Sequence, residues 1–584
     1  MYPKSVENGV NVIFKPAPSQ IIWPKDGERR VLAVDIETVE DDQNRLHRAS
    51  GYMKLVSYTF DGVNVYVEEA FPSQGYEFAH VFSDHVMPTA LEQNYIWVFH
   101  NGTFDLAYLK KDPILRDSAG KLKILPRYLR DTRLIEKALY ANWYKSFSLA
   151  AVVARRFDVV LDKDVRSTFV TGTRNDPITD EQVDYAALDV AFTWRAYDKQ
   201  RVEVQQAPPK LREAILLDSK AAWSTLHFRG APVDVAEWTA NAGRNSTALD
   251  QELRSFPANP RSPKQVLAWL AGLGIHTQTT SAKELKRLAS KHPEVQRLLE
   301  IRKLSKLTSS YGLEWLKFVD ADGNVHPSYN IYGAETSRWS SANPNLQQIP
   351  RGDYRKMFKA PPGYVWVIAD YSQQEVRIAA WMAQDKKLIE LLDRGDVYTE
   401  VGRIIYNDPT MQKTDKRRQL AKSAVLGLLY GLTPNGMAKN QGITKEKAKE
   451  AFDGIKYAFP ALWKFIHDHR QAETDGYVST VMGHMYWLNL WAWNWRNNAA
   501  NSPVQGSGSD MVKIAVYKYT LQRPFEIALV VHDEIAALVP VDEAPRAKAF
   551  LERCMQEAFE ECLPGMPSGK VAEAHIGASW ADKE

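Results

Sequence analysis

The stretch Val365–Arg377, VWVIADYSQQEVR, decides the fold: an apolar run passes directly into an aspartate and a polar turn. Far downstream, Ile527–Glu534, IALVVHDE, repeats the pattern. Short continuous apolar runs bounded by polar residues are typical of buried strands. The pattern therefore predicts two strands that end at Asp370 and Asp533. Two carboxylates at adjacent strand ends can hold a pair of metal ions for phosphoryl transfer.

A basic segment lies between these two strands. Arg418, Lys422, Leu426 and Tyr430 recur every four residues, which places them along one stripe of a predicted helix. Two cations and an aromatic ring on one stripe suit a triphosphate and a base. Taken alone, the segment is more typical of a solvated basic surface helix, because runs of charge usually face solvent.

A second set of acids lies near the N-terminus. Asp35 and Glu37 are two apart at the end of the apolar run Val31–Ile36, so both carboxylates project from one face of a predicted strand. Asp105 follows another apolar run, and Tyr185 and Asp189 are four apart on a predicted helix. Four carboxylates from three segments can hold two Mg²⁺-type ions that activate water against a phosphodiester. The alternative is that these acids are merely solvated.

Composition narrows the class of protein without deciding its function. The 584 residues include 74 basic and 71 acidic side chains, a net charge of +3, which is only a faint indication of a polyanionic partner. No run approaches the roughly 20 apolar residues of a membrane span, and the N-terminus lacks a signal-peptide pattern, so a cytoplasmic protein is expected. The two cysteines, Cys554 and Cys562, predict neither a disulfide nor a zinc site.

The C-terminal segments resemble motifs A, B and C of family A DNA polymerases, the group of bacterial DNA polymerase I and many phage replicases. Three further segments carry the same resemblance, which thus extends from about residue 30 to the C-terminus. They are Thr336–Pro350 (TSRWSSANPNLQQIP), Arg302–Leu307 (RKLSKL) and Asn501–Gly506 (NSPVQG).

This resemblance implies a role for individual residues. Asp370 and Asp533 would bind the catalytic metals with the carbonyl of Tyr371, and Glu534 would support Asp533. Glu375 would be a steric gate against ribonucleotides. Around the incoming nucleotide the resemblance places Gln373, Arg418, Lys422, Leu426 and Tyr430, with Lys422 also catalytic. Against the primer terminus or the DNA minor groove it places Arg338, Asn501, Gln505 and His532.

The N-terminal trio of motifs resembles the DEDD exonucleases that carry a tyrosine in the third motif. That resemblance makes Asp35, Glu37, Asp105 and Asp189 metal ligands, and it gives Tyr185 the task of orienting the attacking water.

The expected fold is multidomain α/β and α+β: a ribonuclease H-like exonuclease domain followed by a right-hand polymerase with thumb, palm and fingers. Residues 1–29 are expected to be an irregular lead-in, 30–200 the exonuclease and 201–320 a mostly helical thumb. Residues 321–584 would form palm and fingers, with the fingers at about 385–480. Ser262 and Pro263 are predicted to begin a thumb helix.

The implied partners are primer–template DNA and dNTPs, with no membrane. The implied cofactor is Mg²⁺, two ions in each active site, for which Mn²⁺ can substitute. A monomeric, phage-type enzyme is expected, without a 5′-nuclease domain and without a processivity-factor insert in the thumb.

Several positions depart from the family pattern. Leu426 replaces an aromatic residue, Gln374 an apolar one and Tyr398 a histidine, while His484 stands where an arginine cluster is common. Trp487, Trp491, Trp493 and Trp495 are unusual, and packing in a core is favoured over base stacking for them.

Three alternatives remain open: a single-subunit RNA polymerase, an accessory nucleic-acid-binding protein with a dead polymerase fold, and an enzyme dominated by its exonuclease. Glu375 and the exonuclease motifs argue against the first. The complete set of acids argues against the second.

Overall fold

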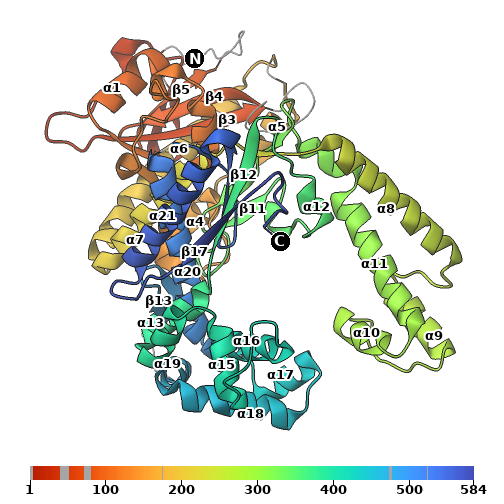
Figure 1. Ribbon diagram of the computed structural model, residues 1–584. Helices are drawn as coiled ribbons and strands as arrows, with labels where there is room; N and C mark the ends of the chain where they lie inside the picture. The colour runs from red at the N-terminus through yellow and green to blue at the C-terminus, as the bar shows by residue number, and fades with distance from the viewer. Residues whose placement is uncertain are drawn as a thin grey trace.

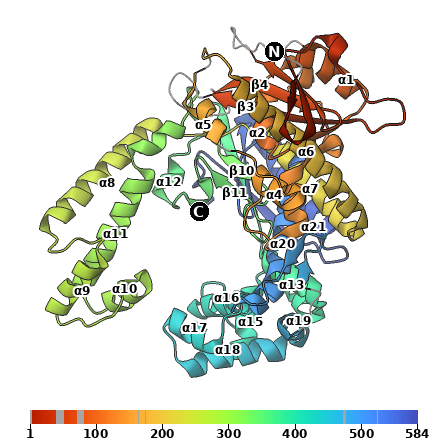
Figure 2. The same ribbon diagram turned by 180° about the vertical axis from the view of Figure 1, so that it is seen from behind.

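A computed structural model describes residues 4–39, 51–70, 81–162, 164–173, 175–471, 476–522 and 524–583. An N-terminal α/β unit lies above a C-terminal unit built around a small antiparallel sheet (Figures 1 and 2). From the C-terminal unit a helical arm, α8 to α11, projects to one side, and a second helical group, α13 to α19, lies below the C-terminal sheet (Figure 1).

The N-terminal unit contains a seven-stranded sheet in the order β1-β2-β5-β4-β3-β6-β7. Strand β3, next to the central strand β4, pairs antiparallel with β4 and parallel with β6. The strands are β1 (Lys4–Val6), β2 (Val10–Phe14), β3 (Val31–Val39), β4 (Tyr52–Thr59), β5 (Asn64–Glu69), β6 (Ile96–Phe99) and β7 (Leu129–Asp131).

The expectation of an irregular lead-in over residues 1–29 is wrong for residues 4–14, which contain β1 and β2, whereas residues 15–29 hold no strand. Strand β2 pairs in parallel with β5, and β1 pairs with β2, so the N-terminus extends the sheet. Val10 and Val12 alternate inward and are fully buried, which drives this pairing. The prolines that follow at positions 16, 18 and 24 lie beyond the strand and do not interrupt it.

Helices cover this sheet and connect it to the rest of the chain. The longest, α6 (Asp180–Gln206), packs along β3 and β4 and runs past residue 200, the expected end of the domain. Three helices contact it, α3 (Thr132–Tyr140), α4 (Leu149–Phe157) and α5 (Asp164–Thr171). The helices α1 (Met87–Glu92) and α2 (Thr103–Leu109) pack in a different core cluster, on the other face of the sheet.

The segment expected to be the thumb divides into two parts. Helix α7 (Pro209–Thr225) packs against α20 and α3 rather than joining the arm. The arm itself is a pair of long helices, α8 (Val235–Ser255) and α11 (Pro293–Tyr311), with α9 (Pro263–Gly272) and α10 (Ala282–Ala289) at its tip. The Ser262 side chain accepts a hydrogen bond from the amide of Gln265 at the start of α9, which confirms the predicted helix start.

The C-terminal sheet has four antiparallel strands in the order β15-β16-β12-β17, with β12 (Tyr364–Tyr371) paired to both neighbours. The other strands are β15 (Glu526–Val531), β16 (Glu534–Pro540) and β17 (Ala572–Gly577). Two long helices support the sheet, α20 (Trp495–Gln522) and α21 (Ala544–Cys562). Both cysteines are on α21, buried and free, as expected.

The second helical group follows β12 directly. It consists of α13 (Gln374–Ala383), α14 (Lys386–Asp393), α15 (Val397–Tyr406), α16 (Lys416–Leu429), α17 (Pro434–Gln441), α18 (Lys445–Ala458) and α19 (Pro460–Gln471). The hairpin β13 (Tyr477–Ser479) and β14 (Met485–Trp487) then leads to α20. Within the described residues, no helix is both long enough and apolar enough to cross a bilayer.

The tryptophan-rich segment does not pack as a whole. Trp487 contacts the N-terminal unit, where its ring meets that of Trp143 edge-on at 5.1 Å, and Trp495 packs beside a small apolar cluster. The expectation of core packing is wrong for Trp491 and Trp493, which are 98% and 93% exposed. Both belong to residues 488–494, called the tryptophan loop below.

Candidate active sites

The two aspartates predicted at strand ends meet at one edge of the C-terminal sheet. Asp370 lies near the end of β12 and pairs in register with Glu534, the first residue of β16. Asp533 occupies the two-residue turn that joins β15 to β16, where His532 adopts a positive φ of 56°. The hairpin therefore carries Asp533 to the side of Asp370.

Like charges accumulate at this edge. Burial, followed by the charge of Asp370, raises the pKa of Asp533 to about 6. The ammonium of Lys583, close to the C-terminus, lies 2.8 Å from Asp370 Oδ2 and 2.7 Å from Glu534 Oε2. The protein's own lysine thus pairs with two carboxylates at this edge, which fits the expectation that the site attracts cations.

Glu534 differs from the two aspartates because it is 6% exposed and both of its oxygens are engaged. Trp580 Nε1 donates to Oε1 at 2.6 Å, and Lys583 holds Oε2. The guanidinium of Arg355 lies 3.7 Å from Oε1. The position of Glu534 therefore fits a role in supporting the β15–β16 hairpin, whereas Asp533 faces the site.

A polar triad lies beside the aspartates. Glu375, in the first turn of α13, accepts hydrogen bonds from the guanidinium of Arg338 and from the hydroxyl of Tyr430 at the end of α16. Residues from three distant segments, all singled out in the sequence, are brought together here. The carboxylate is held from two sides, so its position is fixed.

The basic stripe on α16 has the predicted helical form, but Arg418 already has a partner. Its Nε and Nη2 donate to the two carboxylate oxygens of Asp396 at 2.6 and 2.7 Å. The ammonium of Lys422 lies 5.5 Å from the ring centre of Tyr398, which also faces Arg418. Leu426 packs half-buried against the large core cluster.

The remaining predicted residues of this site have structural contacts of their own. The Tyr371 hydroxyl donates to the carbonyl of Met555 at 3.0 Å, which leaves its main chain at the site edge. Gln373, with a positive φ of 56°, holds the chain near residue 396 through Gly395 and Val397. Two more, Asn501 and Gln505, lie half-buried one turn apart on α20.

The N-terminal acids form a second site. Asp35 and Glu37 project from one face of β3, and Asp189 reaches them from α6. One carboxylate oxygen from each of the three lies within 4.8 Å of the others. Burial, followed by mutual repulsion of the acids, raises the pKa of Asp35, and burial and Asp189 raise that of Glu37. Three repelling carboxylates fit a divalent cation with oxygen ligands.

Asp105 and Tyr185 line the same pocket but are placed differently. Asp105 Oδ1 accepts a hydrogen bond from the amide of Ile36 at 3.2 Å, and burial raises the pKa of Asp105 to about 8. Tyr185 lies beside Asp189, and burial followed by that carboxylate raises the pKa of its phenol. The phenol therefore stays protonated and can donate a hydrogen bond.

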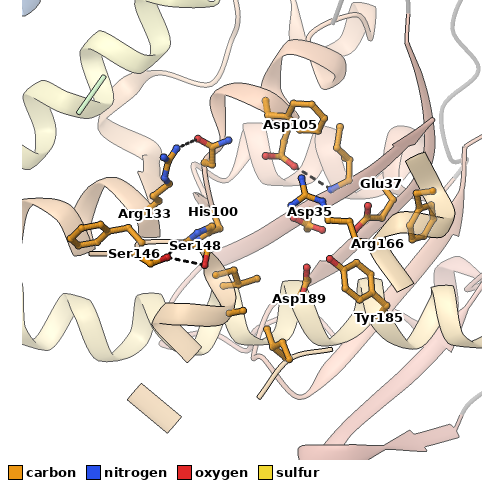
Figure 3. Close-up of a pocket in the computed structure, with 18 of the residues that line it drawn as sticks. Asp35, Glu37, His100, Asp105, Arg133, Ser146, Ser148, Arg166, Tyr185 and Asp189 are labelled. Carbon is orange, nitrogen blue, oxygen red and sulfur yellow. Dashed lines mark hydrogen bonds between the residues drawn. The ribbon is translucent and has the colours of Figure 1, made fainter. Parts of the chain in front are cut away.

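The pocket at this site has a volume of about 570 Å³, and its lining includes cations as well as the acids. Figure 3 shows Arg166 beside Asp35 and Glu37, and Arg133 farther away, where it donates to Asn101 Oδ1 at 2.5 Å. Lys137 and Lys145 complete the basic lining. A pocket lined by both acids and cations suits a phosphodiester substrate with metal ions.

Comparison with known proteins identifies both units. Residues 236–582 match the model of DNA polymerase family A, and residues 21–205 match that of a 3′–5′ exonuclease. The chain belongs to DNA polymerase family A. It is a DNA-directed DNA polymerase that carries a 3′–5′ exonuclease domain on the same polypeptide.

Individual relatives agree with this family A assignment. DNA polymerase I of Aquifex aeolicus is 29% identical over 525 residues, covering 83% of this chain and 87% of its own length. DNA polymerase I of Geobacillus stearothermophilus is 32% identical over 394 residues, or 62% of this chain and 44% of its own. The POL domain of Pol1 from M. smegmatis, solved with DNA primer-template and dNTP, matches with a TM-score of 0.77 and 23% identity, over 96% of this chain and 97% of that one.

The expected fold class of this family A polymerase is confirmed: an exonuclease domain is followed by a right-hand polymerase. The bounds of its parts stay a prediction, in which the C-terminal sheet would belong to the palm, α8 to α11 to the thumb and α14 to α19 to the fingers. Sequence reasoning missed three residues that the fold adds to the sites: Arg166 at the exonuclease acids, Asp396 at Arg418, and Lys583 at Asp370. Asp396 lies two residues before Tyr398, which offered the only signal.

Proposed function

We propose that Asp370 and Asp533 hold the metal ions with which the polymerase joins a primer 3′-hydroxyl to the α-phosphate of a dNTP. The observation that carries the proposal is the convergence of these two carboxylates at one sheet edge, next to the Glu375–Arg338–Tyr430 triad. Bound Mg²⁺ would lower the pKa of the primer 3′-hydroxyl and would neutralise charge on the triphosphate.

The other residues of the site position the substrates. Arg418 and Lys422, both on α16, would bind the triphosphate, and a phosphate would then replace Asp396 as the partner of the Arg418 guanidinium. Glu375 is fixed by two hydrogen bonds where the sugar would lie, so a 2′-hydroxyl would meet a carboxylate that cannot move aside. That arrangement supports deoxynucleotides as substrates. Arg338, Asn501, Gln505 and His532 are proposed to contact the primer–template.

At the exonuclease site we propose hydrolysis of the primer 3′ end. Asp35, Glu37 and Asp189 would hold the metal ions. Asp105 would lie next to them, held by its hydrogen bond from the amide of Ile36 in β3. Tyr185 would donate a hydrogen bond from its protonated phenol to the oxygen of the attacking water and so orient the water, while Arg166 would face the scissile phosphate. We likewise propose Mg²⁺ as the cofactor, primer–template DNA and dNTPs as the partners, and a monomer as the active form.

The deciding experiment follows a labelled primer on a template with dNTPs and Mg²⁺, using wild type and the Asp533→Ala and Asp35→Ala variants. We expect wild type to extend the primer, Asp533→Ala only to shorten it and Asp35→Ala only to lengthen it. Asp353→Ala is the matched control, because that side chain is 84% exposed on α12 (Asp353–Lys356). Extension by Asp533→Ala, or shortening by Asp35→Ala, would refute the assignment of the respective site.

A further inference from the structure

We propose that the tryptophan loop, residues 488–494, binds the single-stranded template ahead of the nucleotide site by stacking its bases on Trp491 and Trp493. The first observation is exposure. The two indoles are 98% and 93% exposed, although large apolar rings are normally buried. Every base has a π-face, so exposed aromatic rings bind single-stranded nucleic acid without reading its sequence.

The loop is held in a defined shape by its own hydrogen bonds. Asn489 accepts two of them, from the amide of Trp491 on its side chain at 3.2 Å and from the amide of Ala492 on its carbonyl at 2.9 Å. The amide of Trp495 then donates to the carbonyl of Ala492 at 3.1 Å. The rings are therefore presented on a folded turn, and little order has to be gained on binding.

Both ends of the loop are anchored to functional parts of the enzyme. Before the loop, Trp487 Nε1 donates to the carbonyl of Leu139 in the exonuclease domain at 2.7 Å. After the loop, the side chain of Asn497 touches Gly431 so closely that a Cβ at that glycine would lie 2.2 Å from Asn497 Oδ1. Gly431 directly follows Tyr430.

The contact between Asn497 and Gly431 indicates which DNA strand the tryptophan loop would bind. The Tyr430 hydroxyl faces Glu375 at the proposed nucleotide site, and Gly431 and Asn497 continue from Tyr430 toward the loop. The primer ends at the nucleotide site, so only the template continues beyond it. The position of the loop, taken together with the proposed function on which the inference rests, therefore favours the unpaired template over the primer.

Charge is consistent with a nucleic-acid surface. From Gly476 to Ser509 the sequence contains no acidic residue, although 71 of the 584 residues are acidic. Arg496, which follows the loop, lies with its guanidinium 4.6 Å from the ring centre of Trp495. A strand of phosphates would meet no repelling carboxylate from this segment.

The test measures binding of primer–templates that differ only in the single-stranded template overhang. For wild type we expect tighter binding with an overhang of several nucleotides than with a blunt end. The double variant Trp491→Ala/Trp493→Ala should lose that gain in affinity, and its Kd for the overhang substrate should rise by about five-fold or more. A factor of about five corresponds to the lower end of the range for one base–aromatic stack. Trp491→Phe/Trp493→Phe should recover part of the lost affinity. Tyr457→Ala on α18 is the matched control, because Tyr457 is 89% exposed on the fingers.

A second readout locates the bound strand. With 2-aminopurine in the overhang, wild type should quench its fluorescence and the double alanine variant should not. Equal affinities of both proteins for the overhang would overturn the proposal. So would a loss confined to primers with a mismatched, frayed 3′ end, or wild-type self-association that the variant abolishes. If wild type binds no primer–template at all, the proposed function fails instead.

Discussion

Four ionisable groups lie buried together in the palm, and His484 is the one whose removal we expect to be most informative. His484 Nε2 is 3.0 Å from Asp218 Oδ2 and its Nδ1 is 2.8 Å from Asp510 Oδ1. Lys513 Nζ is 2.7 Å from Asp218 Oδ1. All four side chains are at most 1% exposed, so two cations and two anions balance only if His484 is protonated.

The magnitude follows from the pKa of His484. Burial alone would lower it, but Asp218 and Asp510 raise it from 6.5 to about 9. A rise of that size is linked to roughly 3 kcal/mol of folding free energy. Because the folded pKa is raised, the stabilisation is fully present below pH 6.5 and is lost as the pH rises through about 9.

We therefore expect His484→Gln to lower the unfolding free energy by about 3 kcal/mol near pH 6.5 and by much less above pH 9. Urea unfolding of wild type and variant across that pH range measures the difference in their unfolding free energies. Other groups that titrate there, such as Lys137 with its pKa lowered to about 8, contribute equally to both proteins and cancel in this difference. His467→Gln, on the exposed side of α19, is the control. A difference that stays constant with pH would show that His484 is neutral in the fold and would refute the reasoning.

Four further outcomes are expected at the polymerase site. Glu375→Ala should raise ribonucleotide incorporation relative to deoxynucleotide by about ten-fold or more, measured as single-nucleotide insertion kinetics, because the fixed carboxylate is removed. Asp396→Asn frees Arg418 from its ion pair, so KM for dNTP should fall by up to about five-fold; a higher KM would contradict the pairing. The pKa of Asp533, about 6, predicts that the Mg²⁺ concentration for half-maximal extension rises below pH 6 and is flat above it. Lys583→Met removes a cation that competes at Asp370, so that concentration should fall a few-fold at pH values above 6.

Local sequence was sufficient where a strand ends in a carboxylate. An apolar run of about six residues can only be a buried strand or a short helix, and an acid at its end must face a site edge or solvent. That reasoning places Asp370 correctly near the end of β12 and Asp533 in the β15–β16 turn. Asp35, in contrast, lies inside β3, which continues to Val39. The order of the motifs along the chain then supplied the family, which local patterns alone could not.

Other features depend on contacts between distant segments and leave no local pattern. The strand around Val10 is only five residues long, and its pairing with β5 fifty residues later is what makes it a strand. The exposure of Trp491 cannot be read from its neighbours, because aromatic residues are far more often buried. The partner of Arg418 was likewise hidden, since Asp396 comes from a separate helix start.

The charges at the two sites explain why their cations could not be found in the sequence. In each site the main chain forces carboxylates together, and one cation from a remote segment partly compensates them: Lys583 at Asp370, and Arg166 at Asp35 and Glu37. Such a cation needs only proximity, so neither its spacing nor its neighbours follow a motif. The remaining repulsion destabilises the metal-free protein, and a bound divalent ion would relieve it. Replacing one of these carboxylates by its amide should therefore stabilise the metal-free protein while it abolishes the activity, the opposite of what loss of a structural ion pair such as Asp218–His484 would do.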